Sequence, residues 1–256
     1  MQARIVGAAR GARWLGEGWQ LFRAAPFGWL GLVLGYWLIM TLVSLVPYAG
    51  IALAAVLVPA FSVGFMAAAR AAEHGARLRF GLLFDGLQQG ARPQLLLGVV
   101  YLLCLGAVLG ATALADEGAL MRWMLTGRRP DEETIQSSGF LTAMATAALL
   151  YAPVMMMFWF APPLAAWHSA PPVKALFFSA AACLMNWRAF VAYAAVTALV
   201  MLVLPFIALS ALMLLSRGAL ALSAMSLVFP LLILLLPTLF ASFYVSYRDI
   251  FGVQKE

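Results

Sequence analysis

The sequence predicts an all-α membrane protein, a polytopic bundle of six transmembrane helices arranged as three helical hairpins. The first observation behind this prediction is composition. The chain is 65% hydrophobic and only 10% charged, whereas a soluble domain carries about a quarter charged residues. The second is an internal repeat in which a proline is followed by an aromatic residue at +6 and an arginine at +11.

The repeat occurs three times along the chain. The copies are Pro59 with Phe65 and Arg70, Pro153 with Trp159 and with Leu164 in place of the arginine, and Pro237 with Phe243 and Arg248. We therefore expect a single membrane domain over residues 1–256, built from three repeats. Their limits are about 14–79, 80–170 and 171–250.

Six apolar segments are long enough to cross a hydrocarbon core of about 30 Å. They are residues 27–46, 51–70, 93–115, 139–167, 189–216 and 219–247. The fourth contains Pro162 and Pro163, so we expect an irregular end, with the helix stopping near Phe160. Two glycine pairs have a spacing that permits close helix approach, or arises by chance in a glycine-rich chain. The pairs are Gly31 with Gly35 and Gly106 with Gly110.

Each hairpin is preceded by a stretch with helical amphipathic periodicity, which we expect to lie in the cytoplasmic interface of the membrane. The expected apolar faces are Trp14, Leu15, Gly18, Trp19 and Phe22, then Phe80, Leu83, Phe84 and Leu87, and finally Val173, Leu176, Phe177, Ala180, Ala181 and Leu184. In the first of these helices, Glu17 and Gln20 are expected on the opposite side.

Pro59, Pro153 and Pro237 are the candidate helix kinks, because proline removes one helical hydrogen bond and frees a carbonyl. Eleven residues place each kink about 16 Å from the end of its helix, near the middle of the membrane. Midplane helix breaks are typical of transporters, but prolines also simply shape membrane bundles. The spans have no charged residue at midplane, which argues against transport of ions or charged solutes.

Arg70 and Arg248 are most simply anchors at the inner interface. Alternatively, they form a cytoplasmic network with nearby acids. The candidate acids are Asp85, Asp249 and Glu73. Spacing along the chain does not choose among these partners.

The sequence has no motif of a known catalytic or cofactor site, and no carboxylate lies within a span. His74 and His168 occupy equivalent repeat positions, which a pseudo-threefold arrangement would hold apart, so we expect no metal, haem or other cofactor. The net charge of +6 comes from arginines that flank apolar segments, where they set orientation. We therefore expect no nucleic-acid partner.

Three stretches carry a resemblance to a known family: GWQLF at 18–22, the 59–70 segment followed by GLLF at 81–84, and YVSYRDIF at 244–251. On these, the chain resembles an uncharacterised family of proteobacterial six-span integral inner-membrane proteins. More loosely, it resembles the membrane domain attached to bacterial glycerophosphodiester phosphodiesterases, without their soluble catalytic domain. The resemblance implies fold and location and carries no activity.

The leading functional hypothesis is a non-enzymatic multi-pass inner-membrane protein that organises or assists other membrane components. Its expected partners are the lipid bilayer and other membrane proteins or a second copy of itself. The alternative is a carrier for a neutral or amphipathic solute or lipid. An intramembrane enzyme is a distant third.

Charge bias predicts that both termini are cytoplasmic, since 12 of the 16 Lys and Arg residues fall on the side of the termini and four on the other. Reporter fusions after Phe251 and within residues 127–137 measure this directly. The C-terminal fusion should report a cytoplasmic location and the internal one a periplasmic location. A periplasmic signal from the C-terminal fusion would contradict the predicted topology.

Overall fold

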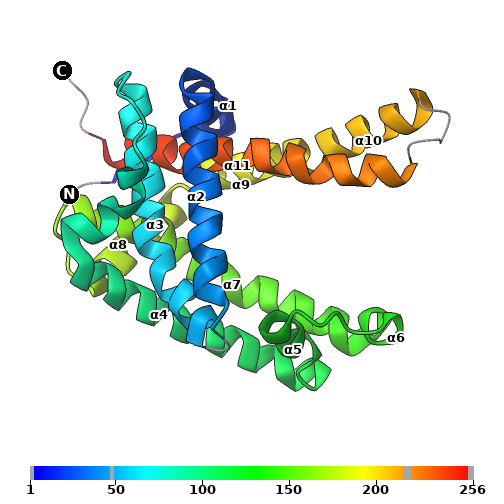
Figure 1. Cartoon of the computed structure of the whole chain (residues 1–256). Coiled ribbons are helices and arrows are strands. Elements are labelled where there is room, and N and C mark those ends of the chain that lie inside the picture. The colour runs from blue at the N-terminus through cyan, green and yellow to red at the C-terminus, as the bar shows by residue number, and fades with distance from the viewer. Residues whose placement is uncertain (1–2, 47–48, 216–220, 253–256) are drawn as a thin grey trace. The chain divides into compact units, whose positions relative to one another are not determined.

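A computed structural model describes residues 3–46, 49–215 and 221–252, and every regular element among them is a helix (Figure 1). The helices are α1 (Ala8–Ala24), α2 (Pro26–Ser44), α3 (Ala49–Glu73), the 3-10 turn η1 (Phe80–Phe84), α4 (Asp85–Asp116), α5 (Ala119–Thr126), α6 (Glu132–Gln136), α7 (Ser138–Trp167), α8 (Pro172–Met185), α9 (Trp187–Ala198), the π-helical segment η2 (Leu199–Val203), α10 (Leu204–Leu215) and α11 (Ala221–Phe251).

Five helical segments among the described residues are long and apolar enough to cross a membrane. They are Pro26–Ser44, Ala49–Glu73, Phe80–Asp116, Ser138–Trp167 and Trp187–Ala211. The sixth expected span, 219–247, begins in residues outside the described ranges and continues into α11. The chain is thus an all-helical protein with several membrane-capable helices.

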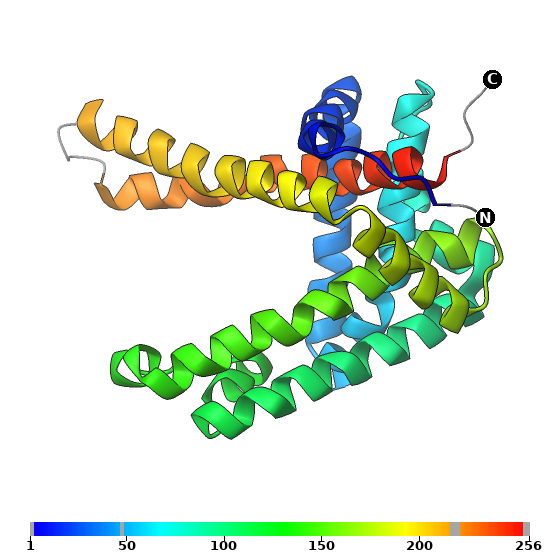
Figure 2. The ribbon, with the colours of Figure 1, turned by 180° about the vertical axis from the view of Figure 1, so that it is seen from behind.

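The helices form two compact units, each described here by itself. Unit 1 comprises Met1–Tyr36, Gly64–Leu83 and Ala182–Glu256, and unit 2 comprises Trp37–Val63 and Phe84–Ala181. In unit 2, α4 and α7 run side by side (Figures 1 and 2). In unit 1, α1 packs against α9 and α11.

Two polar side chains in unit 2 complement the backbone of α7 around its prolines. The buried hydroxyl of Ser179, on α8, accepts a hydrogen bond from the Phe160 amide at 2.9 Å and donates to the Met156 carbonyl at 2.7 Å. It therefore bridges the two groups that an ordinary i→i−4 helical bond would join. Gln94, fully buried on α4, donates through Nε2 to the Pro162 carbonyl at 2.9 Å.

The sequence predicts that this helix ends near Phe160, and that prediction is wrong. The α7 helix continues through Pro162 and Pro163 to Trp167. The two prolines leave the carbonyls of Phe158 and Trp159 without their usual helical donors, but the helix continues, and Ser179 and Gln94 hold other backbone groups of the same stretch.

A π-helical segment precedes Pro205. Helix α9 passes through η2 into α10 without leaving helical conformation. Pro205 has no amide hydrogen to bond the carbonyl of Met201, four residues earlier, and that residue lies within the π segment.

Close backbone packing in unit 1 centres on two glycines of α1. A Cβ added to Gly11 would lie 2.0 Å from the carbonyl oxygen of Ala189 on α9, and one added to Gly18 would lie 2.5 Å from that of Thr238 on α11. The two glycine pairs identified from the sequence do not make such close backbone contacts. A Cβ at Gly31, Gly106 or Gly110 would meet nothing within 4 Å, and one at Gly35 would meet the ring of Phe80.

The first amphipathic segment forms α1, but its buried face differs from the expected one. Trp14, Leu15 and Phe22 are buried, whereas Trp19 is 42% exposed. The close approach at Gly11 and Gly18 fixes which side of α1 meets α9 and α11, whereas Trp19 lies at the edge of that side, with its ring 5.3 Å from the ring of Phe22.

The second amphipathic segment is not a separate helix. Residues Phe80–Phe84 form a 3-10 turn, and α4 begins directly at Asp85. Gly90 adopts non-helical angles inside α4, just before Pro93, so the end of the expected interfacial segment and the span expected from residue 93 form one kinked helix.

The third segment forms α8, and its large apolar residues face outward. Val173, Phe177 and Leu184 are 79%, 68% and 59% exposed. The buried face consists of small residues, among them Ala175 and Ser179. This is the arrangement expected of a helix whose apolar stripe meets lipid.

The N-terminal segment is hydrogen-bonded to unit 1 before α1 begins. The Arg4 amide donates to the Ile250 carbonyl at 2.9 Å, and the Val6 amide donates to Asn186 Oδ1 at 2.7 Å. Asn186, 1% exposed, returns a bond from Nδ2 to the Arg4 carbonyl at 3.0 Å. The buried Asn186 side chain therefore bonds both an amide and a carbonyl of the N-terminal segment.

The glycine contacts predict opposite effects for two substitutions on α1. Gly11→Ala should destabilise the protein by about 1–3 kcal/mol, because a methyl group cannot fit against the Ala189 carbonyl. Gly16, on the same helix, has nothing within 4 Å of its position, so Gly16→Ala should be neutral or stabilise by about 0.4–1 kcal/mol.

The measurement is the melting temperature of each purified variant in detergent. Equal melting temperatures for the two variants would contradict the close α1–α9 contact.

Candidate functional site: a charge network at the ends of α1, α3 and α11

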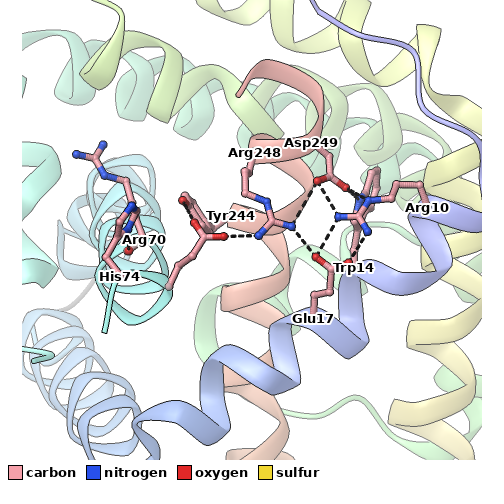
Figure 3. A network of polar contacts seen from close by, with 9 residues as sticks. Arg10, Trp14, Glu17, Arg70, His74, Tyr244, Arg248 and Asp249 are labelled. Carbon is pink, nitrogen blue, oxygen red and sulfur yellow. Dashed lines mark hydrogen bonds and ion pairs between the residues drawn. The ribbon is translucent and has the colours of Figure 1, made fainter. Parts of the chain in front are cut away.

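Charged side chains from three helices of unit 1 meet in one network, shown in Figure 3. Arg10, Trp14 and Glu17 come from α1, where spacings of four and three residues place them on one helical face. Glu73 is the last residue of α3. Tyr244, Arg248 and Asp249 come from the final turns of α11.

Arg10 joins α1 to the end of α11. Its Nε donates to Asp249 Oδ2 at 2.5 Å and its Nη2 donates to Asp249 Oδ1 at 2.9 Å. The same guanidinium also donates to both carboxylate oxygens of Glu17, with the Nη2 bond at 3.0 Å. Such two-point pairing fixes orientation as well as distance.

Arg248 connects α11 to the other two helices. Its Nη2 donates to Glu17 Oε2 at 2.5 Å, and its Nη1 donates to Glu73 Oε1. Glu73 also accepts a hydrogen bond from the Tyr244 hydroxyl at 2.5 Å. Glu17 is therefore shared by both arginines, and the three helix segments are joined through two carboxylates.

Trp14 links the network to the apolar interior of unit 1. Its indole Nε1 donates to Asp249 Oδ2 at 2.8 Å, and its side chain is fully buried. The ring meets Phe190 edge-on at 5.3 Å and Tyr193 at 5.7 Å between centroids. Asp249 thus accepts bonds from a cation and from a buried aromatic donor.

The network lies between surface and interior. Its side chains are 10% exposed at Asp249, 25–26% at Glu17 and Glu73, and 31–32% at the two arginines. Partial removal from water strengthens the ion pairs relative to surface pairs, but it makes any unpaired member costly. Two arginines face three carboxylates, so the cluster is slightly acidic by formal charge.

Both arginines are held in the charged form. Hydrogen bonding to Asp249, reinforced by Glu17, outweighs burial and raises the pKa of Arg10 above its ordinary value. Burial alone would lower the pKa of Arg248, but its hydrogen bonds to Glu73 and Glu17 outweigh that cost and raise it. The arrangement serves to join helices, and both cations are fully engaged with protein carboxylates.

Of the residues singled out from the sequence, Arg248 and Asp249 lie in this network. Arg70 lies one turn before Glu73 on α3, and its carbonyl accepts a hydrogen bond from His74 Nδ1 at 2.7 Å (Figure 3). Asp85 begins α4 in unit 2, where its carboxylate accepts a bond from Gln89 at 2.5 Å.

The three candidate kink prolines, Pro59, Pro153 and Pro237, lie within the continuous helices α3, α7 and α11. The side chain of Leu149, whose carbonyl Pro153 would free, is 74% exposed. The side chain of Ile233, the corresponding residue for Pro237, lies outside the described set.

Sequence reasoning missed Arg10, Trp14 and Glu17. The available signal was that these polar and aromatic residues share one face of an amphipathic helix, rather than lying on opposite sides. Their partners lie up to 239 positions away, so periodicity could show the face but not what it meets.

The described helices are those of a multi-pass helical membrane protein, and a relative of the chain assigns it to the bacterial inner membrane. The chain is 40% identical, over its full length and 96% of the other protein, to "Probable inner membrane protein" of Burkholderia thailandensis. The chain belongs to the family of that protein. No protein-family profile matches the chain, and no solved structure matches it.

The network predicts strong coupling between Arg10 and Asp249. Arg10→Gln and Asp249→Asn should each destabilise the protein by about 1–2 kcal/mol, below the cost at fully buried pairs because some exposure remains. The double variant should lose less than the sum, by about 1 kcal/mol, since each single change already breaks the shared bonds.

A thermal-denaturation double-mutant cycle in detergent measures this coupling. Arg129→Gln is the matched control, because its ion pair with Glu132 is 64% and 67% exposed and should contribute about 1 kcal/mol at most. Strict additivity of the Arg10 and Asp249 variants would argue against a direct pair.

Proposed function

We propose that this chain is a non-enzymatic inner-membrane protein that organises or assists other membrane components. The observation that carries the proposal is the closed charge network around Arg10 and Arg248. Both cations are occupied by protein carboxylates, so the most conspicuous polar cluster of unit 1 serves assembly of the helices. A site for catalysis or for passage of a charged solute would instead need groups available to a substrate.

The proposed topology has six spans in three hairpins, each preceded by an interfacial segment, with both termini cytoplasmic. The five membrane-capable helices support five of these spans, and α11, 31 residues long, is long enough for a sixth. The charge bias along the chain supports the orientation. The outward apolar stripe of α8 supports an interfacial position for the third segment.

The proposed partners are the lipid bilayer and other membrane proteins or a second copy of this chain. Nucleic acid is not among them, because the arginines that give the positive net charge flank apolar helices or are neutralised, as Arg10 and Arg248 are. Residues on the outer face of α8, such as Phe177, are natural positions for photo-crosslinking in cells.

A carrier of a neutral or amphipathic solute or lipid is the second candidate. The π segment Leu199–Val203 favours it, because π turns in helices are frequent at functional sites and leave backbone groups open to rearrangement. Against it, α3 and α7 remain regular through Pro59 and Pro153. An intramembrane enzyme is a third and weaker candidate, with no residue set to support it.

The Pro237→Ala variant distinguishes the scaffold hypothesis from the carrier hypothesis. If the proline only shapes a static bundle, liposomes containing the wild-type protein should show no uptake of neutral solutes and no exchange of labelled lipid above empty liposomes. The substitution should then change only stability. Melting temperature and gel filtration show whether the variant folds as the wild type does. If the wild type shows flux and an equally folded Pro237→Ala variant does not, the carrier hypothesis replaces the scaffold hypothesis.

A further inference from the structure

A cavity lies outside the charge network, in the segment between α4 and α7. It has a volume of about 340 Å³ and lies entirely within unit 2. Its polar lining consists of two arginines, two threonines and an acid: Arg122, Arg128, Thr126, Thr134 and Asp131. These residues lie on α5, on α6 and in the turn that joins them.

The cavity is built on an ordered scaffold. Leu120 of α5 is buried against Phe140 and Ala143 of α7, with Trp123 packed beside them. The Asp116 carboxylate accepts hydrogen bonds from two backbone amides at the start of this segment, at 2.9 and 2.7 Å. The lining residues therefore have defined positions.

Hydrogen bonds also fix the turn that carries the lining. The Thr126 hydroxyl donates to the Arg122 carbonyl at 2.7 Å and accepts from the Arg128 amide at 3.3 Å. Asp131 caps α6 by accepting a bond from the Thr134 amide at 2.8 Å. These bonds fix the backbone from which both arginine side chains extend, and the carboxylate of Asp131.

The two arginines that line the cavity differ from the third arginine of this segment. Arg129 is paired with Glu132 at 2.6 Å. Arg122 instead donates to a neutral group, the Glu117 carbonyl, at 2.8 Å, and the ion pairs found among the described residues do not include Arg128. Their positive charge is therefore available to an anion, and guanidinium groups favour phosphate oxygens.

The location sets what can reach the cavity. Helix α4 ends at Asp116 and α7 begins at Ser138, so the segment between them joins the ends of two membrane-capable helices and, in the proposed topology, lies at the membrane surface. Met124 and Leu125 on α5 are exposed and can meet the apolar edge of the bilayer. Phosphate groups of phospholipids are concentrated at this depth.

Asp131 adds a second element of recognition. Hydrogen bonds from Thr134 hold the pKa of Asp131 below its ordinary value, so its carboxylate is charged at neutral pH. A carboxylate beside two arginines disfavours a plain anion and favours a ligand that carries an amine close to its phosphate.

We propose that the cavity between α5 and α6 binds a phosphoryl group through Arg122 and Arg128, with Asp131 selecting a phosphate ester that also carries an ammonium group. A phosphoethanolamine headgroup has this chemistry, whether it belongs to a membrane lipid or to a soluble ester. The site is independent of the charge network in unit 1 and of the choice between scaffold and carrier.

Native mass spectrometry of the full-length protein in detergent tests the site with phosphatidylethanolamine, phosphatidylglycerol and phosphatidylcholine as probes. The wild type should retain phosphatidylethanolamine in preference to the other two. The double variant Arg122→Gln/Arg128→Gln should bind at least about tenfold more weakly, because two charge-assisted contacts are lost. Arg129→Gln, whose arginine is already paired, should bind as the wild type does.

Asp131→Asn keeps an N-cap acceptor for α6 and should therefore leave the fold intact. It should abolish the preference for phosphatidylethanolamine over phosphatidylglycerol while leaving phosphate binding in place. Melting temperatures of all variants confirm equal folding. Equal lipid retention by the double arginine variant, or an equal loss in Arg129→Gln, would overturn the proposal.

Competition distinguishes the two sources of the ligand. Glycerophosphoethanolamine and inorganic phosphate are added to the lipid-bound protein. Displacement of the lipid by glycerophosphoethanolamine at similar concentration assigns the site to a soluble ester, and retention of the lipid assigns it to the membrane. Displacement by inorganic phosphate as readily as by glycerophosphoethanolamine would overturn the role given to Asp131.

Discussion

The pairing of Arg10 with Asp249 joins the first helix of the chain to the last. Within unit 1, the position of α1 depends on it: Glu17 reaches Arg248 only when α1 lies along the end of α11, and Trp14 reaches Asp249 only in the same arrangement. The glycine contacts of α1 and the hydrogen bonds at Asn186 agree with that placement. Partly buried charges impose such geometry because each is costly without its partner.

In unit 2, α7 continues as a helix through Pro153, Pro162 and Pro163. Side chains from neighbouring helices form hydrogen bonds with its backbone. Ser179 enters the ladder of α7 and Gln94 bonds the Pro162 carbonyl. Both side chains are fully buried, so their bonds replace water that is absent. The small residues on the inner face of α8 allow this approach and leave its large apolar residues facing outward.

These features bear on function in the same direction. The internal pairing of Arg10 and Arg248 and the helices that continue through prolines favour the proposed role of holding a fixed arrangement in the membrane. The π segment at Leu199–Val203 is the departure from that regularity in the fifth membrane-capable helix. In the proposed topology, the cavity at the α5–α6 turn lies at a membrane surface and can meet lipid headgroups.

Composition and periodicity alone determined the class of this protein. A chain with so few charges must bury its apolar helices in a membrane, and this conclusion does not depend on which helices touch. The same patterns located the membrane-capable segments and the outward stripe of α8. They also marked Arg248 and Asp249 as candidates, since charged residues at the end of an apolar helix are readily seen.

Only the tertiary structure identified the hydrogen-bond and ion-pair partners of the charged residues. Spacing could not choose among Asp85, Asp249 and Glu73 for Arg248, nor find Glu17, because ion pairing depends on proximity across more than two hundred residues. Amphipathic periodicity gave the apolar face of α1 but not which of its residues are buried against α9 and α11. Sequence reasoning ended α7 near Phe160 because a proline's missing bond is visible in the sequence, whereas the serine and glutamine that bond this stretch of backbone lie on other helices.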